Sequence, residues 1–492
     1  MAQGNESPFK DELLRADTAL VDETHTAENT VLTYTTSTRA RVQRKSPFLH
    51  VLSFLHLAII ASFLSDWWNK SASDLRFTDY PAFLTGWKMV VTGQTAHLYD
   101  LAAQAKVQHA LINGSFKNDV LPFNYPPYIA SIFGGLGRVS LTTGYWIWAA
   151  TNVALAGVLL ILLRRITRLV GTEWKRYALW VMAVAPLWAA FIGGVFSLWI
   201  TVGVAGFVLA TLEGRQFSAG IWLGLVAFKP QYLPVLIVFM ITRRMWKALA
   251  GAATVGATLF AVSIPTVGIE GWRGFLSLLQ KFSGNGSRMN AHAELMWSAR
   301  GAVTRLVEEG TLYAASDDRW LALPHDKLTE KISYVLFGIG MVCVASLGRK
   351  INLRIHLALA ICAMVIVSPH GHSHDTLLMV IAVGLAWSVA RNKLNVCNGS
   401  QRDSSLSLSS VIRAAEKQST IALPHKTQLA LMVSALPMYA AFTVLRSSLS
   451  LLPLVAYCAM AAWAWGHRHD PELEPQTQTG RSSSLATAPV TP

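Results

Sequence analysis

An aspartate, Asp79, stands in the short stretch 77–81 (FTDYP) that follows the first apolar run of the sequence. A carboxylate in such a place is usually solvated or caps a helix, because polar residues before a proline commonly begin a helix. The alternative is a general base at the mouth of a cavity, which takes the proton of an attacking hydroxyl. Asp79 is therefore the first candidate for a catalytic residue.

A lysine, Lys229, lies well inside the apolar run 218–241 and is followed by Pro230 and Gln231. A charge at membrane depth costs several kcal/mol unless it is paired or faces water, which makes such a lysine a functional candidate. The proline breaks the helix and leaves backbone groups that need partners. The alternative is a lysine near a helix end whose ammonium group reaches the membrane surface.

Three histidines and one aspartate fall within the stretch 368–375 (SPHGHSHD), between two apolar runs. Of these, His370, His374 and Asp375 are candidates to bind substrate, because imidazole N–H groups can bind a phosphate. A simple polar turn is the second interpretation. Metal binding is the third interpretation. Histidines at every second position can bind the same ion only if the loop is extended. We predict no metal site.

Two further segments carry candidate residues. Tyr125 lies in the stretch 123–128 (FNYPPY), which predicts a rigid turn with tyrosines at the membrane interface. The segment 281–300 contains Lys281, Arg288, His292, Glu294 and Arg300. It either folds over a bound substrate, with Arg288 as a substrate contact, or is a solvated loop.

The composition indicates a membrane protein. The 492 residues are 52% hydrophobic and only 14% charged, whereas soluble domains average about 25% charged residues. The net charge of +14 does not indicate nucleic-acid binding, because no nucleic-acid motif is present and the lysines and arginines cluster at the ends of apolar segments. Four cysteines are too few for a disulfide scaffold and lack the spacing of a zinc site.

The apolar runs predict an all-α polytopic membrane protein with about twelve transmembrane helices. Residues 66–124 form a long outer segment, in which Tyr80–Val91 and Leu101–Ile112 are predicted as short amphipathic helices lying on the membrane. The predicted spans are 48–64, 126–140, 143–163, 177–194, 197–213, 218–241, 248–268, 332–348, 355–368, 376–390, 428–445 and 450–466.

The basic residues predict the orientation of the chain. With the N-terminus inside, the basic groups near 243–247, 349–354 and 391–393 fall on the inner side, as the positive-inside rule requires. The basic segment 164–176 falls outside. Either the count of spans is wrong near 126–163, or this segment contacts the outer leaflet; we favour the miscount. The outer segments 66–124 and 269–331 are the long ones, so chemistry is expected at the outer face.

These elements predict five regions of the chain and the cellular location of the protein. Tails at 1–46 and 467–492 are expected to be disordered, the first of them cytoplasmic. Residues 47–390 form a transmembrane catalytic core, 391–427 a cytoplasmic serine-rich loop, and 428–466 a terminal pair of transmembrane helices. We expect a multi-pass protein of the plasma (inner) membrane with its active site on the outer, periplasmic face.

The order and spacing of several motifs over residues 50–390 resemble glycosyltransferase family 87, polyprenyl-phosphate-mannose-dependent mannosyltransferases with a GT-C-type fold. One element departs from the family, which often has a Gly-Gln-x-Asn pattern where this chain reads GGVFS at 193–197. The matching elements are TDYPAF at 78–83, GQ at 93–94 with LYD at 98–100, FNYPP at 123–127, Trp148 with Asn152, Gly224 with KPQ at 229–231, and SPH at 368–370 with Asp375.

The resemblance implies that a sugar, mannose above all, is transferred with inversion from a polyprenyl phosphate to a lipid-linked or envelope glycan. Asp79 would then be the general base. An inverting transfer needs no covalent intermediate, and the leaving phosphate needs donors and cations. The residues expected to bind the donor phosphate or other parts of the substrates are Lys229, His370, His374, Tyr125, Gln231, Arg288 and Asp375.

No cofactor is expected, since the polyprenyl-phosphate sugar is a co-substrate, and the expected partners are membrane lipids, that donor, and a glycan or glycolipid acceptor. The alternative is a multi-pass transporter of a sugar or lipid-linked substrate, with which Lys229 and the helix-breaking prolines are compatible. The unequal loops and the lack of an internal repeat argue against it.

Overall fold

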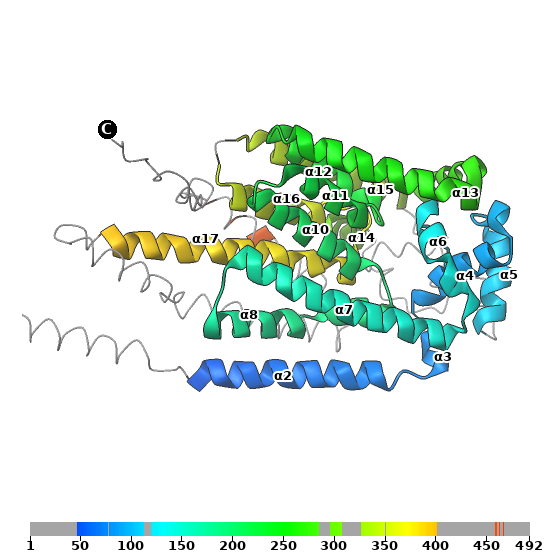
Figure 1. Cartoon of the computed structure of the whole chain (residues 1–492), viewed down its shortest axis with the longest axis horizontal. Helices are drawn as coiled ribbons and strands as arrows, with labels where there is room; N and C mark the ends of the chain where they lie inside the picture. Colours follow the sequence, from blue (N-terminus) through cyan, green and yellow to red (C-terminus); the bar gives the residue numbers. More distant parts are fainter. Residues whose placement is uncertain are drawn as a thin grey trace, which may run out of the picture. The chain divides into compact units, whose positions relative to one another are not determined.

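The computed structural model describes residues 47–76, 78–112, 120–284, 296–307, 326–349 and 351–400, together with residues 458, 459, 462 and 466 (Figure 1). The chain divides into two units, Met1–Leu55 and His56–Pro492. Of the first unit, the described part is the beginning of helix α2. All of the candidate residues belong to the second unit, and the account below concerns that unit.

Helices make up most of the described residues, and no strand occurs among them, in agreement with the predicted all-α class. The α-helices are α2 (Pro47–Trp68), α3 (Ala72–Leu75), α4 (Tyr80–Val91), α5 (Leu101–Ile112), α6 (Pro127–Phe133), α7 (Leu141–Thr167), α8 (Gly171–Ala183), α9 (Ala185–Gly193), α10 (Ser197–Leu212), α11 (Gln216–Val226), α12 (Leu233–Thr242), α13 (Trp246–Gly284), α14 (Ala299–Val307), α15 (Asp326–Ser346), α16 (Leu353–Ile366) and α17 (Met379–Ser400). The 3₁₀-helices are η1 (Thr95–His97), η2 (Gly134–Arg138), η3 (Pro230–Tyr232) and η6 (Ser373–Leu378).

Five of the described helical segments are long and apolar enough to cross a membrane, and a sixth counts if the bent pair α8 and α9 forms one span. Shorter apolar helices follow at α10, α11, η3 with α12, and α16. The chain is therefore a helical membrane protein. The expected number of about twelve spans is not established, because 428–445 and most of 450–466 lie outside the described residues.

Residues 126–140, which were predicted to span the membrane, do not do so. Two prolines begin α6, which has seven residues, and a glycine-rich 3₁₀-helix of five residues follows it. A side chain at Gly137 would place its Cβ 2.2 Å from the carbonyl oxygen of Trp87, so η2 packs against the backbone of α4. The buried face of α6, formed by Pro127, Tyr128, Ile129 and Ala130, therefore packs against protein, and α6 with η2 is too short to cross a membrane.

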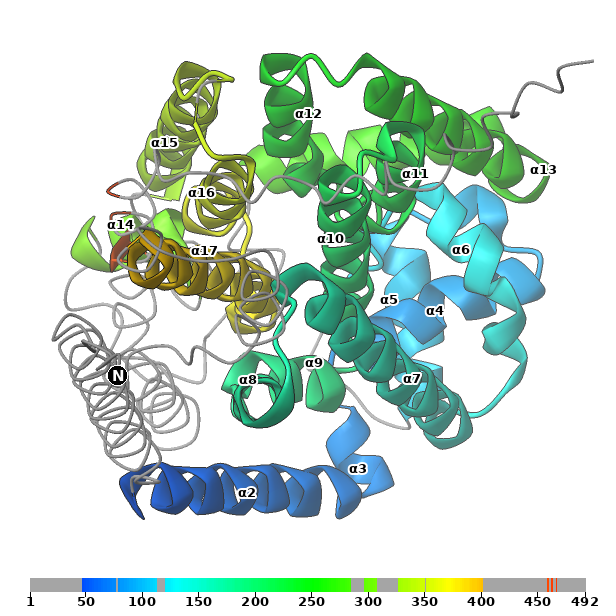
Figure 2. The same cartoon turned by 60° about the vertical axis from the view of Figure 1, so that its left-hand side comes forward.

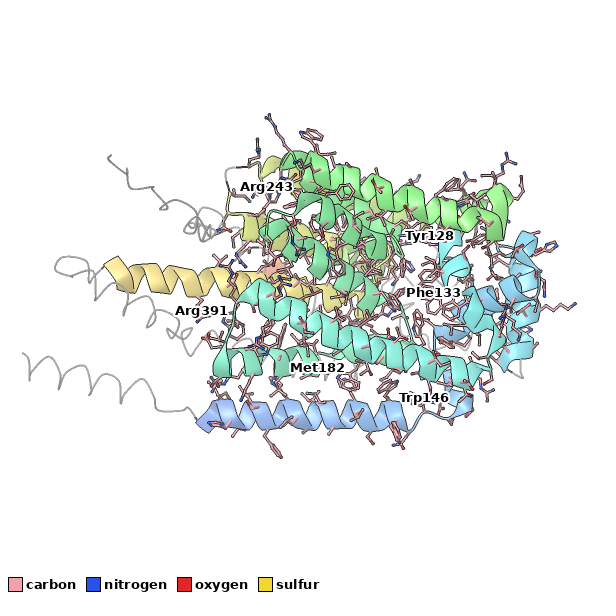
Figure 3. All side chains as sticks on the ribbon, viewed as in Figure 1. Tyr128, Phe133, Trp146, Met182, Arg243 and Arg391 are labelled. Atoms are coloured by element: carbon pink, nitrogen blue, oxygen red, sulfur yellow. The ribbon has the colours of Figure 1, made fainter. Side chains whose placement is uncertain are left out.

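The basic segment 164–176 lies at the same end of the helices as the later basic turns. Arg354 donates to the carbonyl oxygen of Ile166 at 2.7 Å, and Arg391 donates to that of Arg168 at 3.2 Å. Figure 3 shows Arg391 and Arg243 at the same end of the helices, away from Tyr128 and Phe133.

A single miscount does not account for this arrangement. Removing the span 126–140 brings 164–176 to the side of the later basic turns only if those turns do not change sides, and one span fewer reverses them all. The predicted span 218–241 supplies the second change, because it is divided into α11 and η3 with α12, and counting it as two segments returns the later turns to their predicted side.

The two short helices predicted in the first long loop are present with the predicted bounds, as α4 and α5. The expectation that α4 lies on a membrane surface is wrong, because nine of its twelve residues are buried within the protein. It packs against α5, α6, α7 and η2. In α5 the buried positions are Gln104, Gln108 and Ile112, so two amides face the protein together with one apolar side chain.

The buried glutamines of α5 bind the chain segment that leads to Tyr125. Gln104 accepts the N–H of Phe123 at 2.7 Å, and its amide N–H donates to the carbonyl oxygen of Leu98 at 2.7 Å. Gln108 accepts the N–H of Leu121 at 2.8 Å and donates to its carbonyl oxygen at 3.0 Å. The side-chain amides of Gln104 and Gln108, one helical turn apart, thereby bind the backbone groups of Phe123 and Leu121. These bonds fix the position of the segment that leads into α6.

Helix α10 occupies a central place, since it packs against α7 on one side and α11 on the other (Figure 2). Its sixteen residues are apolar apart from Ser197, Thr201 and Thr211, and most of them are buried. At its N-terminal end it also contacts η6. Helix α10 therefore brings Ser197 beside the histidine-rich stretch, where the candidate site is formed.

Candidate active site

Asp79 lies directly before α4, and its position is set by a backbone contact to α9. The N–H of Asp79 donates to the carbonyl oxygen of Gly193 at 3.1 Å. Pro81 in the first turn of α4 fixes the start of that helix, and the carboxylate of Asp79 does not cap it. A Cβ on Gly193 would lie 3.9 Å from Oδ2 of Asp79, so a glycine there leaves the carboxylate room.

The carboxyl group of Asp79 is harder to ionise than an ordinary aspartate. Burial raises the pKa of Asp79 to about 6, the charge of Lys229 lowers it, and the charge of Asp375 raises it further. Burial is the largest of these effects, because a carboxylate loses hydration as it leaves water. The influence of Lys229 and Asp375 means that these two residues, distant in sequence, lie near Asp79.

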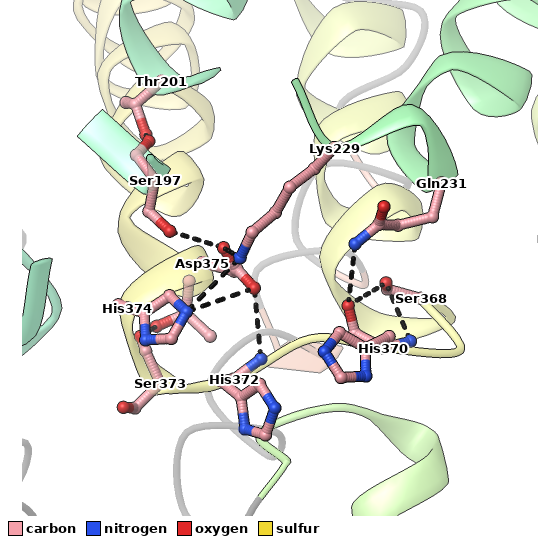
Figure 4. Close-up of polar contacts among 11 residues, drawn as sticks. Ser197, Thr201, Lys229, Gln231, Ser368, His370, His372, Ser373, His374 and Asp375 are labelled. Carbon is pink, nitrogen blue, oxygen red and sulfur yellow. Dashed lines mark hydrogen bonds and ion pairs between the residues drawn. The ribbon is translucent and has the colours of Figure 1, made fainter. Parts of the chain in front are cut away.

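Lys229 forms an ion pair with Asp375 at the break between α11 and η3. Its Nζ lies 2.6 Å from Oδ1 of Asp375 and 3.3 Å from Nε2 of His374 (Figure 4). Both ionised side chains are buried, with exposed fractions of 7% and 3%. Lys229 does not reach the membrane surface, and its charge is balanced inside the protein.

The carboxylate of Asp375 accepts further hydrogen bonds besides the one from Lys229. The hydroxyl of Ser197 donates to Oδ1 at 2.5 Å, and the backbone N–H of His372 donates to Oδ2 at 3.2 Å. His374 lies 3.7 Å from Oδ2. Hydrogen bonds and the ion pair thus replace the water that the carboxylate of Asp375 loses on burial. A buried ion pair is tolerated in an apolar environment only when its charges are satisfied in this way.

Tyr125 lies beside the two carboxylates. The charges of Asp79 and Asp375 and, above all, burial raise the pKa of its hydroxyl well above the usual value. The ring packs against Phe83 and Phe196, with centroids at 4.9 Å and 5.3 Å. A neutral phenol held in this way can donate or accept a hydrogen bond at the edge of the site.

Gln231 and His370 meet through the backbone of the histidine-rich stretch. The amide of Gln231 donates to the carbonyl oxygen of His370 at 3.4 Å, and the hydroxyl of Ser368 donates to the same oxygen at 3.0 Å. Burial lowers the pKa of His370 well below its usual value, and the neighbouring His372, Lys229 and Arg300 act in the same direction. The imidazole of His370 is therefore neutral.

The structure thus brings together Asp79, Tyr125, Lys229, Gln231, His370, His374 and Asp375. Arg288, predicted as a substrate contact, lies outside the described residues. Within the described part of the chain, no three His, Cys, Asp or Glu side chains are arranged to hold a metal ion.

Ser197 belongs to the site and was not a candidate from the sequence. It stands in the stretch 193–197 that departs from the family pattern, so this departure was the available signal. A serine in an apolar run has no partner that sequence alone can identify. Its bond to Asp375 joins residues 178 positions apart.

The arrangement combines one carboxylate, that of Asp79, which has neither a hydrogen bond nor an ion pair among the described residues, with a buried and neutralised ion pair. Asp79 is the group that can take up a proton near neutral pH. Neutral imidazoles and amides around it can donate hydrogen bonds to a polar substrate. Fold and site together define a helical membrane protein with a polar centre suited to acid–base chemistry.

A comparison with models of protein families identifies the class of this membrane protein. The model of glycosyltransferase family 87 matches residues 123–369, half of the chain, and the chain belongs to this family. Lys229, Gln231 and Tyr125 lie inside the matched segment. His370 and Asp375 lie just after its end, whereas Asp79 lies well before its start. No curated protein and no solved structure matches the chain. The protein is a membrane glycosyltransferase, and the transporter alternative is not favoured.

Proposed function

We propose that the protein transfers a sugar, mannose in the first instance, from a polyprenyl monophosphate to a lipid-linked or envelope glycan. In this proposal Asp79 is the general base and the anomeric centre is inverted. The observation that carries it is the buried carboxyl group of Asp79, whose pKa of about 6 lies close to physiological pH. A base is most effective when its pKa is near the working pH.

In the proposed reaction the carboxylate of Asp79 takes the proton of an acceptor hydroxyl while the hydroxyl oxygen attacks the anomeric carbon. The bond from that carbon to the phosphate oxygen breaks, and the polyprenyl phosphate leaves with the electron pair. The charge that grows on the phosphate is stabilised by the ammonium group of Lys229 and by the imidazoles of His370 and His374. Tyr125 and Gln231 orient the sugar.

The basic turns provide the argument for orientation. Positively charged segments of membrane proteins remain in the cytoplasm, and here they gather at one end of the helices. We therefore place that end in the cytoplasm and the site toward the outer, periplasmic face of the plasma membrane. A donor embedded in the membrane reaches such a site from the side, with its chain between the helices.

The test uses the purified full-length protein with polyprenyl-phosphate mannose and a mixture of lipid-linked acceptors. Wild type is expected to transfer mannose, whereas Asp79→Asn is expected to lose at least about 100-fold in rate, the typical contribution of a general base. Asp79→Glu tests whether a displaced carboxylate restores part of the rate. Asp66→Asn, which changes an exposed aspartate of α2, is the matched control.

Equal rates for wild type and a folded Asp79→Asn would remove Asp79 as the base. If wild type uses polyprenyl-phosphate glucose or a pentose donor but not the mannose donor, the mechanism is retained and the identity of the sugar is corrected. Transfer from a nucleotide sugar alone would contradict the proposed class of donor.

A further inference from the structure

Helix α14 begins directly against the backbone of the histidine-rich stretch. The N–H of Trp297 donates to the carbonyl oxygen of Gly371 at 2.9 Å. The Nη1 of Arg300 donates to the carbonyl oxygen of Pro369 at 3.0 Å. These two contacts hold the N-terminal end of α14 beside residues 369–371.

The residue that precedes α14, Ser298, is buried with an unsatisfied hydroxyl. Its exposed fraction is 1%, and its Oγ has no hydrogen-bond partner among the residues that the structure describes. A serine at this position normally caps the helix by accepting an N–H of the first turn, and here it does not. Its carbonyl oxygen accepts the N–H of Ala302, which leaves the N–H groups of the first turn directed out of the helix.

The absence of a side chain at Gly371 leaves room next to Ser298. A Cβ on Gly371 would lie 3.7 Å from the Cβ of Ser298 and 3.6 Å from the Oγ of Ser368. Ser298 therefore faces the loop that carries the histidines. A buried hydroxyl is costly unless a ligand or water satisfies it, and the N–H groups of the first turn of a helix have no acceptor within that helix.

The electrostatics of this position favour an anion. Arg300 lies in the first turn of α14 with an exposed fraction of 6%, and its charge acts on the neighbouring His370. The rings of His370 and His372 lie 4.8 Å apart. The N-terminal end of a helix adds partial positive charge and N–H donors. Lys229, the other buried cation nearby, already has Asp375 as its partner.

We propose that the first turn of α14, with Ser298 and Arg300, binds the phosphate group of the lipid-linked donor, which is a diester in the donor and becomes a monoester when the sugar leaves. This inference rests on the proposed function and names the part of the protein that contacts the leaving group. A guanidinium fork, a hydroxyl and helix N–H groups suit the several acceptor oxygens of a phosphate. The imidazole of His370 is a further donor to the same group.

The experiment measures binding of a polyprenyl monophosphate that carries no sugar to the full-length protein in detergent micelles, by isothermal titration. The variants are Ser298→Ala and Arg300→Gln. The control is Arg273→Gln, which changes an exposed arginine of α13. Arg300→Gln is expected to raise the Kd at least about tenfold and Ser298→Ala several-fold, because each removes a donor to a charged group. The control is expected to bind like wild type.

Arg300 also donates to the carbonyl oxygen of Pro369, so Arg300→Gln can disturb folding. Ser298→Ala removes no hydrogen bond of the described structure and is the safer variant. Unchanged Kd values for both variants would overturn the inference. The polyprenol without phosphate is expected to bind wild type and the two variants equally. Competition by vesicles of phosphatidylglycerol as strong as that by polyprenyl phosphate would instead define a general site for lipid headgroups, and competition by inorganic phosphate alone a site for free phosphate.

The result also separates this inference from the proposed function. Wild-type protein that transfers sugar while Ser298→Ala and Arg300→Gln bind the polyprenyl phosphate normally would refute the phosphate site and leave the transfer reaction. Protein that binds the polyprenyl phosphate through Ser298 and Arg300 but transfers no sugar would leave the site and refute the reaction. Asp79→Asn is expected to bind this ligand and to transfer nothing.

Discussion

Replacing Lys229 by methionine is expected to destabilise the protein, and replacing Lys229 and Asp375 together is expected to restore most of the loss. The side chains contact each other at 2.6 Å and are 7% and 3% exposed. Removing one partner leaves the other charge buried without its counter-ion. Methionine keeps the length of the lysine side chain, so packing changes little.

The size of the effect follows from the contacts that remain. Breaking a buried ion pair costs about 3–5 kcal/mol. Asp375 still accepts the hydroxyl of Ser197 and the N–H of His372, so the lower end, about 3 kcal/mol, is expected for Lys229→Met. For Lys229→Met combined with Asp375→Leu, the loss falls to about 1 kcal/mol, because replacing both charges of a buried pair by apolar groups is often nearly neutral.

The measurement is unfolding of the two single variants, the double variant and wild type in mixed detergent micelles. The cycle yields a coupling free energy, expected to be at least about 2 kcal/mol. Arg273→Met, at the exposed pair with Glu270, is the control and is expected to unfold like wild type. If the double variant instead lost as much unfolding free energy as the two single variants together, the coupling free energy would be zero. That result would refute the charge balance described for the site.

Three further outcomes are expected. The transfer rate should fall about tenfold per pH unit below about pH 6 and be constant above it, because burial raises the pKa of Asp79 to about 6 and only the carboxylate is a base; a flat profile between about pH 5 and 8 would contradict this. The same shift means that ionising Asp79 opposes folding, so Asp79→Asn should unfold later than wild type above about pH 6 and equally below about pH 4, as thermal unfolding at the two pH values would show. Gln104→Leu should cost about 1–3 kcal/mol in unfolding free energy by leaving the buried N–H of Phe123 without an acceptor, whereas Lys106→Leu, at an exposed position of the same helix, should cost less than about 0.5 kcal/mol. Gly137→Ala should lower the melting temperature because its Cβ would lie 2.2 Å from a backbone oxygen, whereas Gly135→Ala, which meets nothing within 4 Å, should not; equal melting temperatures would refute the close packing of η2 on α4.

Short helices with strong end signals were predictable from the sequence. The bounds of α4 and α5 agree with the prediction, since a proline in the first turn and glycine after the last mark the limits of α4. The environment of α4 was not predictable. Hydropathy measures how apolar a segment is, and it does not distinguish a helix that faces lipid from one that faces other helices.

The same limitation explains the error at 126–140. The run is apolar enough for a span, but Pro126 and Pro127 and the glycines of η2 prevent a continuous helix. A proline pair followed by closely spaced glycines was the available signal. The conflict with the basic segment 164–176 indicated an error in the count near the same position. Because one span fewer reverses the side of every later turn, a second error further along was also required, at the predicted span 218–241.

Candidate residues were predictable where their chemistry conflicts with their surroundings. Lys229 in an apolar run and the histidine-rich stretch are such cases, and the structure places them together. The partner of Lys229 was not predictable, since Asp375 is 146 residues away and local sequence carries no information on pairing. Ser197 and Ser298 were missed because a serine hydroxyl is unremarkable until its burial and its partners are known.

The charge balance of the site decides how Lys229 can act on a leaving phosphate. If its ammonium group moved to the phosphate, Asp375 would lose its counter-ion inside the membrane protein, at a cost of about 3–5 kcal/mol. The first turn of α14 offers N–H donors and partial positive charge to the phosphate without any movement of Lys229. Lys229 then acts on the reaction through its field, which lowers the pKa of Asp79 and favours the ionised base beside a second carboxylate. The double variant without Lys229 and Asp375 therefore tests two things at once: it should fold, and it should still bind polyprenyl phosphate through Ser298 and Arg300.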